Sequence, residues 1–168
     1  MSLLPAGTRR RLMRDPRGWL AAGFGAGFSP RMPGTMGSLA AILPWWGWLH
    51  ALPPADYAGF LLLAFVVGVL SANWVIRQCR VEDPSLVVWD EYLGMWVALW
   101  MLPREWPWVL LAFVLFRLFD IWKPWPVRWA DRRLKGGFGT MVDDLLAGLM
   151  ALAVVQGLLA AWPLLAVR

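Results

Sequence analysis

The sequence predicts an all-α integral membrane protein, a polytopic bundle of about five apolar helices that forms one domain over residues 1–168. Its residues are 60% hydrophobic and only 16% charged, and the mean hydropathy is +0.54, which is too apolar for an ordinary soluble domain. Fourteen tryptophans are typical of chains that meet a membrane interface. The net charge of +5 therefore indicates loops that face anionic lipid, and no nucleic-acid partner is expected.

Five apolar segments follow a basic N-terminal arm, residues 1–18, which we expect on the membrane surface. Glycines and prolines interrupt the chain from Gly23 to Gly34, which predicts a shaped loop or a re-entrant turn. The apolar segments cover residues 35–49, 57–76, 86–102, 108–122, and from 141 or 144 to 167. The first segment is short and the third carries acids near its start. Either one can be re-entrant or lie in the interface instead of crossing.

Basic residues gather on alternate connections of this arrangement. One side receives the arm, Arg77 and Arg80, and the basic residues of 123–135, whereas the other side receives only Arg104 and Arg168. The positive-inside rule then puts the N-terminus in the cytoplasm and, with five crossings, the C-terminus outside. The same topology brings three polar stretches to the cytoplasmic face. They are the loop of residues 23–35, the acidic pair at 90–91, and the segment 120–144.

The acids at this face need a physical reason, because a carboxylate near lipid is costly unless it is paired or bound to metal. They are Asp90, Glu91, Asp120, Asp131, Asp143 and Asp144. No competing cysteine or histidine ligand accompanies them at this face, so they favour a hard, all-oxygen site for Mg²⁺ or Mn²⁺. Phosphate could be neutralised by the neighbouring cations, Lys123, Arg128, Arg132 and Arg133. His50 lies at the predicted outer face, which excludes a phosphohistidine route. Phosphate chemistry on a lipid is the resulting hypothesis.

Structural roles explain the same residues as an alternative. Arg117 and Asp120 are three residues apart on a helix and can form an ion pair. The pair Asp143 and Asp144 can simply favour a helix N-terminus. The basic residues of Arg128–Lys135 can simply keep this connection on the cytoplasmic side, by the positive-inside rule. From the pattern, these structural roles and the chemical ones stay open.

Three segments carry a resemblance to a known family: GFGAGFSPRMPGTMGSLAA, VVWDEYLGMW and FRLFDIWKPWPVRWADRRLKGGFGTMVDDLLAG. In residues and in order along the chain, these segments are similar to those of phosphatidylglycerophosphatase A. The similarity extends from about Gly23 to Gly148. The resemblance implies a Mg²⁺-dependent phosphatase of the bacterial inner membrane, multi-pass, with its active site facing the cytoplasm. Its substrate would be phosphatidylglycerophosphate, from which it removes the terminal phosphate by metal-assisted phosphoryl transfer to leave phosphatidylglycerol.

The resemblance places the family's polar positions on the residues named below, and our hypothesis gives each of them an expected role. The catalytic set is Asp90, Glu91, Asp120, Lys123, Asp143 and Asp144. The metal ligands within it are the five acids, Asp90, Glu91, Asp120, Asp143 and Asp144. The substrate-binding set is Ser29, Thr35, Lys123, Arg128 and Arg132. Direct hydrolysis and a covalent aspartyl-phosphate intermediate both stay open.

Two functions from other classes remain as alternatives. A cation transporter would use intramembrane acids to bind a passing metal. A non-catalytic membrane subunit would bind anionic lipid without releasing phosphate. Small residues allow close packing of helices or of subunits, so a homo-oligomer also stays open; they are Gly137, Gly139, Ala147 and Gly148.

Overall fold

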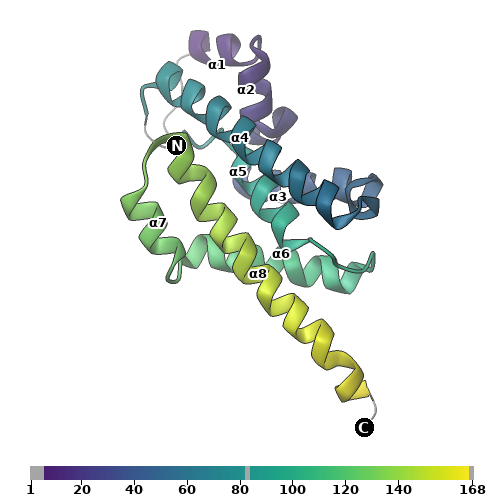
Figure 1. The fold of residues 1–168 in the computed structure, drawn as a ribbon. Coiled ribbons are helices and arrows are strands. Elements are labelled where there is room, and N and C mark those ends of the chain that lie inside the picture. Colours follow the sequence, from purple (N-terminus) through teal and green to yellow (C-terminus); the bar gives the residue numbers. More distant parts are fainter. Residues whose placement is uncertain (1–5, 82–83, 167–168) are drawn as a thin grey trace.

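The computed structural model describes residues 6–81 and 84–166, and this part of the chain is helical without strands (Figure 1). Residues 1–5 of the predicted arm, the end of the fifth segment at 167, and Arg168 lie outside the described residues. The elements are α1 (Ala6–Leu12), α2 (Pro16–Ala21), η1 (Gly23–Phe28), α3 (Pro33–Gly47), η2 (Leu49–Ala51), α4 (Pro54–Cys79), α5 (Trp89–Ala98), α6 (Trp106–Trp122), α7 (Val127–Arg133) and α8 (Gly136–Ala166). The all-α prediction is confirmed for the described residues.

Two of these helices are long and apolar enough to cross a membrane. They are α4, and α8 over residues 136–162, with mean hydropathies of 2.2 and 2.0. The third predicted segment forms the 10-residue α5. At 1.5 Å per residue α5 is about 15 Å long, half of a hydrocarbon core of about 30 Å, so it cannot cross alone. The open alternative for this segment, that it does not cross, fits its length. A bundle of about five apolar helices, one or two of them short or re-entrant, remains a prediction.

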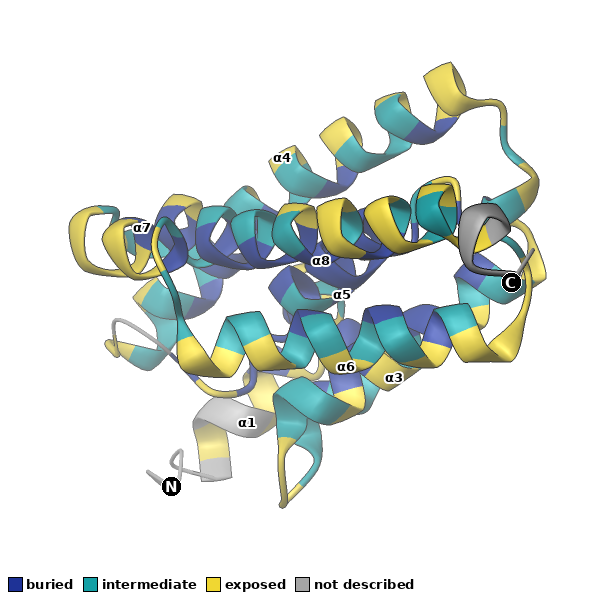
Figure 2. Ribbon diagram, turned by 90° about the horizontal axis from the view of Figure 1, so that it is seen from below, coloured by how far each residue is buried: buried dark blue, intermediate teal, exposed yellow. Residues whose placement is uncertain are grey.

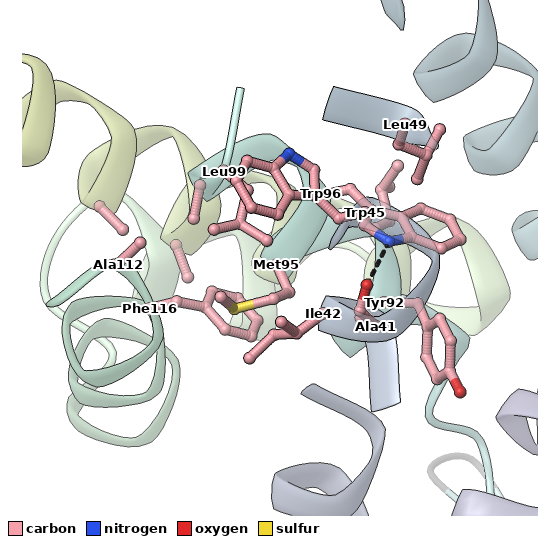
Figure 3. Packing of buried hydrophobic residues seen from close by; sticks show 14 of the residues in the cluster. Ala41, Ile42, Trp45, Leu49, Tyr92, Met95, Trp96, Leu99, Ala112 and Phe116 are labelled. Atoms are coloured by element: carbon pink, nitrogen blue, oxygen red, sulfur yellow. Dashed lines mark hydrogen bonds between the residues drawn. The ribbon is translucent and has the colours of Figure 1, made fainter. Parts of the chain in front are cut away.

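α5 is the central helix of the molecule. Nine of its ten residues are buried, and Figure 2 shows it in dark blue beneath α8. The helices α3, α4, α6 and α8 enclose it. Figure 3 shows its side chains Met95 and Trp96, with Leu99 just after the helix, among residues of α3 and α6, including Phe116. The Trp96 indole N–H donates to the carbonyl of Ala41, 2.9 Å away, which joins α5 to α3.

Glycines let α5 and α8 approach until their backbones touch. A side-chain carbon added at Gly148 would lie 2.3 Å from the carbonyl oxygen of Gly94, and one at Gly94 would lie 2.7 Å from the carbonyl oxygen of Asp144. Neither distance is possible for real atoms, so both positions require glycine while the helices keep this separation. The contact fixes Asp144 beside the first turns of α5.

Side-chain bonds define two ends of the helix assembly. At one end the backbone N–H of Gly137 donates to Asn73 Oδ1 over 2.9 Å, which ties the start of α8 to α4. At the other end Gln156 Nε2 donates to the carbonyl of Trp100 over 3.0 Å. α8 therefore runs antiparallel to α4 and alongside α5. The last turns of α8 extend past the other helices in Figure 1.

The glycine- and proline-rich stretch forms the predicted shaped loop, with η1 as its first part. Gly23 and Gly25 both have positive φ angles, +54° and +113°. The Tyr92 hydroxyl donates to the carbonyl of Gly23 over 3.0 Å, so the loop packs on the first turns of α5. α3 then begins at Pro33, and this arrangement puts Gly34 and Thr35 in its first turn.

Candidate active site

A cavity of about 510 Å³ lies where the starts of α3, α5 and α8 meet the end of α6 and α7. Seven of the residues predicted for the site line it: Thr35, Asp90, Glu91, Asp120, Lys123, Asp143 and Asp144. Three stretches that are far apart in sequence therefore surround one space. The predicted convergence of the glycine-rich loop, the acidic pair and the segment 120–144 is present.

Three of the acids form a compact cluster. One carboxylate oxygen from each of Asp90, Glu91 and Asp144 lies within 4.8 Å of the other two. Asp90 and Asp144 are buried, with 8% and 4% of their surface exposed, and Glu91 is partly buried. Asp90 and Glu91 occupy the first turn of α5, where the helix dipole favours negative charge. None of the three has a cationic partner within ion-pair distance among the described residues.

Two oxygens of this cluster support a bound cation. Glu91 Oε2 and Asp144 Oδ2 are buried, and neither has a hydrogen-bond partner among the described residues. A buried carboxylate oxygen without a partner is costly, and a cation between the two oxygens removes that cost. The donors are all carboxylates, with no cysteine or histidine in the cavity lining, which fits a hard divalent cation. The residues present therefore fit Mg²⁺.

The other two acids predicted as metal ligands are paired with cations. Asp120 Oδ2 lies 2.7 Å from Arg117 Nη1, which is the ion pair that the spacing of the two residues allowed. Asp143 Oδ2 lies 3.0 Å from Lys123 Nζ, which also bonds to Asp131. The five acids thus divide into a cluster of three and a flanking pair.

Lys123 is held in its charged form by its partners. It follows the last residue of α6 and adopts a left-handed backbone conformation that ends the helix. Partial burial opposes its charge, but hydrogen bonds to Asp131 and Asp143 outweigh this effect and raise the pKa of Lys123 above its ordinary value. The cavity therefore contains a permanent ammonium beside its acidic cluster.

Three predicted substrate-binding residues do not line this cavity. The Ser29 hydroxyl donates to the carbonyl of Arg31 over 2.8 Å, within the loop before α3. Arg128 and Arg132 line a second hollow on the outer side of α7. A role for these three residues in binding substrate stays a prediction.

Other cavity residues were absent from the predicted site. The most important is Arg117, whose Nε is buried without a hydrogen-bond partner among the described residues. Its position one helical turn before Asp120 was visible in the sequence, but that spacing is equally typical of a plain ion pair. Thr140 lies one turn before Asp143 and Asp144 on α8, so helical periodicity could have found it. Ser85 and Lys135 carry no comparable signal in the sequence.

Comparison with known proteins decides the family. A family model described as Phosphatidylglycerophosphatase A matches residues 19–159. The chain belongs to the phosphatidylglycerophosphatase A family. The matched range contains every residue that lines the cavity. No solved structure matches the chain.

Individual relatives of the phosphatidylglycerophosphatase A family cover most of the chain. A phosphatidylglycerophosphatase A of Escherichia coli K12 is 43% identical over 98% of both chains. One of Haemophilus influenzae is 40% identical over 84% of this chain and 87% of its own. A Bacteroides thetaiotaomicron protein provisionally named phosphatidylinositol-3-phosphatase is 41% identical, over 81% of this chain and 89% of its own. Relatives of similar identity therefore carry names with different lipid headgroups.

Gly34 is predicted to set the position of the Glu91 carboxylate. A side-chain carbon at Gly34 would lie 2.2 Å from Glu91 Oε1, and that oxygen can move because it ends a flexible side chain. We expect Gly34→Ala to keep the fold while shifting the carboxylate, and to slow phosphate release on the order of 100-fold. Initial rates of phosphate release measure the effect.

Gly47→Ala in the same helix is the matched control, because nothing lies within 4 Å of the added carbon. Equal rates for Gly34→Ala and Gly47→Ala would contradict the role given to Gly34.

Proposed function

We propose that the chain is a membrane lipid phosphatase that hydrolyses the terminal phosphate monoester of phosphatidylglycerophosphate, giving phosphatidylglycerol and inorganic phosphate. The observation that carries the proposal is the buried cluster of Asp90, Glu91 and Asp144, which shares one cavity with Arg117 and Lys123. Membership of the phosphatidylglycerophosphatase A family supports the substrate.

The acidic cluster is the proposed site of Mg²⁺. Glu91 Oε2 and Asp144 Oδ2, both without partners among the described residues, would bind the ion together with Asp90. Asp120 and Asp143, each held in an ion pair, add two further carboxylates to the cavity wall. Bound there, Mg²⁺ would polarise the phosphoryl group as a Lewis acid.

The cations across the cavity would hold the phosphate. Lys123 has one N–H donor left beyond those that bond to its two carboxylate partners, and an ammonium stabilises the charge that develops on phosphoryl oxygens as the ester bond breaks. Thr35, in the first turn of α3, adds a hydroxyl donor. Water attacks phosphorus directly, or a carboxylate such as that of Asp120 attacks first and water then hydrolyses the acyl phosphate. Both routes release one alcohol and one phosphate per water consumed.

Arg117 is the guanidinium best situated to bind the substrate phosphate. Its Nη1 bonds to Asp120, whereas its buried Nε has no partner among the described residues and the side chain lines the cavity. A buried guanidinium N–H without an acceptor is costly, and a phosphate oxygen would satisfy it. Arg117 thus carries a structural ion pair and, in this proposal, a substrate contact.

The proposed location is the bacterial inner membrane, with the cavity facing the cytoplasm. The two helices of membrane-crossing length support insertion. Basic residues of α7 and of the C-terminal turn of α4 lie toward the cavity end of the molecule, as the positive-inside rule requires for a cytoplasmic face. Arg104, near the opposite end, packs over the ring of Trp46 with 5.0 Å between the guanidinium carbon and the ring centre.

The reaction is tested by supplying the purified chain, in detergent micelles, with lipid phosphates and measuring inorganic phosphate. We expect fastest release from phosphatidylglycerophosphate, and slower release from phosphatidylinositol-3-phosphate and phosphatidic acid. A chelator should abolish release, and added Mg²⁺ should restore it. Asp144→Asn should be inactive, whereas Asp56→Asn, an exposed acid in the first turn of α4, should match the wild type.

Each rival function gives a distinct result in this assay. No phosphate from any lipid would contradict the phosphatase, and ion flux across sealed vesicles would then favour a cation transporter. Lipid retention without phosphate release would favour a non-catalytic lipid-binding subunit. Preference for phosphatidylinositol-3-phosphate would keep the phosphatase and overturn the proposed headgroup.

Arg117→Lys is predicted to weaken substrate binding while keeping the fold. Lysine preserves the positive charge beside Asp120 but removes the Nε donor and the planar guanidinium. We expect KM to rise about tenfold or more, with a smaller fall in kcat. Full kinetic curves and the thermal unfolding midpoint measure the two effects separately.

The matched control is Arg104→Lys, an exposed arginine near the opposite end of the molecule. A purely structural Arg117 would lower the unfolding midpoint of Arg117→Lys and leave KM unchanged, and that result would contradict the substrate contact.

A further inference from the structure

A second hollow, of about 410 Å³, lies on the outer side of α7. Its lining defines what we call the α7 platform: Trp125, Arg128, Trp129, Arg132 and Arg133. None of these residues lines the acidic cavity. Figure 2 shows α7 at the edge of the molecule with much of its surface exposed.

α7 separates its charges onto two sides. Asp131 bonds to Lys123 and lines the acidic cavity, and the buried Val127 and Ala130 anchor the helix against the molecule. The platform residues at 128, 129, 132 and 133 recur at the spacing of one face of α7, and Trp125 lies in the turn just before the helix. The platform is therefore a separate, uniformly basic and aromatic surface on the back of the active-site wall.

The three platform arginines have no carboxylate partner in the described part of the chain. None has a carboxylate within 4.0 Å among the described residues, and all three are exposed. The only hydrogen bond that the described part of the chain gives to these guanidiniums is a long one, from Arg128 Nη2 to the carbonyl of Trp122 at 3.5 Å. Three free guanidiniums around one hollow are suited to the bidentate binding of a phosphate group.

The tryptophans of the platform indicate what accompanies that phosphate. Trp125 is 79% exposed and Trp129 52% exposed, and the end of α6 adds Ile121 and Trp122, 69% and 67% exposed. Free phosphate or a nucleic acid backbone gives no reason to expose this much apolar surface beside the arginines. Indole rings next to arginines are typical of helices that lie at a membrane surface.

We propose that the α7 platform binds the headgroup phosphate of an anionic membrane phospholipid, at a site distinct from the acidic cavity. The arginines hold the headgroup and the indoles enter the interface. This inference goes beyond the proposed reaction, because it requires neither the acidic cluster nor hydrolysis. Its consequence is that α7, whose other side lines the cavity, keeps the cavity at the depth of the lipid phosphates.

The test is native mass spectrometry of the full chain in detergent, titrated with dioleoyl phosphatidylserine or with dioleoyl phosphatidylcholine. Phosphatidylserine is anionic but has no phosphate monoester, so its binding is independent of the phosphatase reaction. We expect the wild type to retain phosphatidylserine in preference. The triple variant Arg128→Gln, Arg132→Gln, Arg133→Gln should bind it about tenfold or more weakly.

Two further variants separate specific binding from charge and from folding. The triple variant Arg10→Gln, Arg11→Gln, Arg14→Gln removes the same charge from exposed positions in the N-terminal region and should retain the lipid. Trp125→Ala with Trp129→Ala should weaken retention while the net charge stays constant. Should the α7 triple variant not fold, the single variant Arg132→Gln replaces it, with a smaller loss expected.

Several results would overturn the proposal. Equal retention of phosphatidylserine by the wild type and the platform variants would contradict a lipid site at the platform. An equal loss in the N-terminal triple variant would make the binding a matter of net charge. Displacement of the lipid by the same concentration of inorganic phosphate, or preferred binding of a short oligonucleotide, would show a site for another anion.

Discussion

Mutual repulsion among buried carboxylates is the constraint on which the structure of this site depends. Asp90, Glu91 and Asp144 bring oxygens within 4.8 Å of one another in a largely apolar chain, and none has a cation within ion-pair distance among the described residues. Burial weakens the solvent screening of such charges, so the arrangement is unfavourable by itself. A divalent cation bound there would offset that repulsion, which supports the proposed metal site.

Close glycine contacts help to hold that cluster together. Gly94 and Gly148 let α5 and α8 touch, which fixes Asp144 beside the first turn of α5. Gly34 then leaves room for the Glu91 carboxylate at the start of α3. The cations are attached to the flanking acids instead of the cluster, so the charge of the three central carboxylates remains available to a ligand.

Much of the fold and of the candidate site could be predicted from the sequence, because composition and spacing are local properties. The apolar segments predicted the helices. The asymmetry of the basic residues predicted that the polar stretches lie at one end of the molecule. The length of α5 could not be predicted, because the apolar run that contains it continues into a turn after Ala98. Nor could the sequence predict which neighbouring cations line the cavity. Lys123 lines it whereas Arg128 faces outward, and that difference depends on how α7 packs against α8.

The central claim, that the acidic cluster binds a divalent cation, is tested most directly by titrating the purified chain with Mn²⁺ and following free Mn²⁺ by electron paramagnetic resonance. The account predicts saturable binding that Mg²⁺ displaces, and its loss in Glu91→Gln and Asp144→Asn. Glu105→Gln, an exposed acid just before α6, should bind as the wild type does. Unchanged Mn²⁺ binding in Glu91→Gln and Asp144→Asn, or no specific binding in the wild type, would contradict the account.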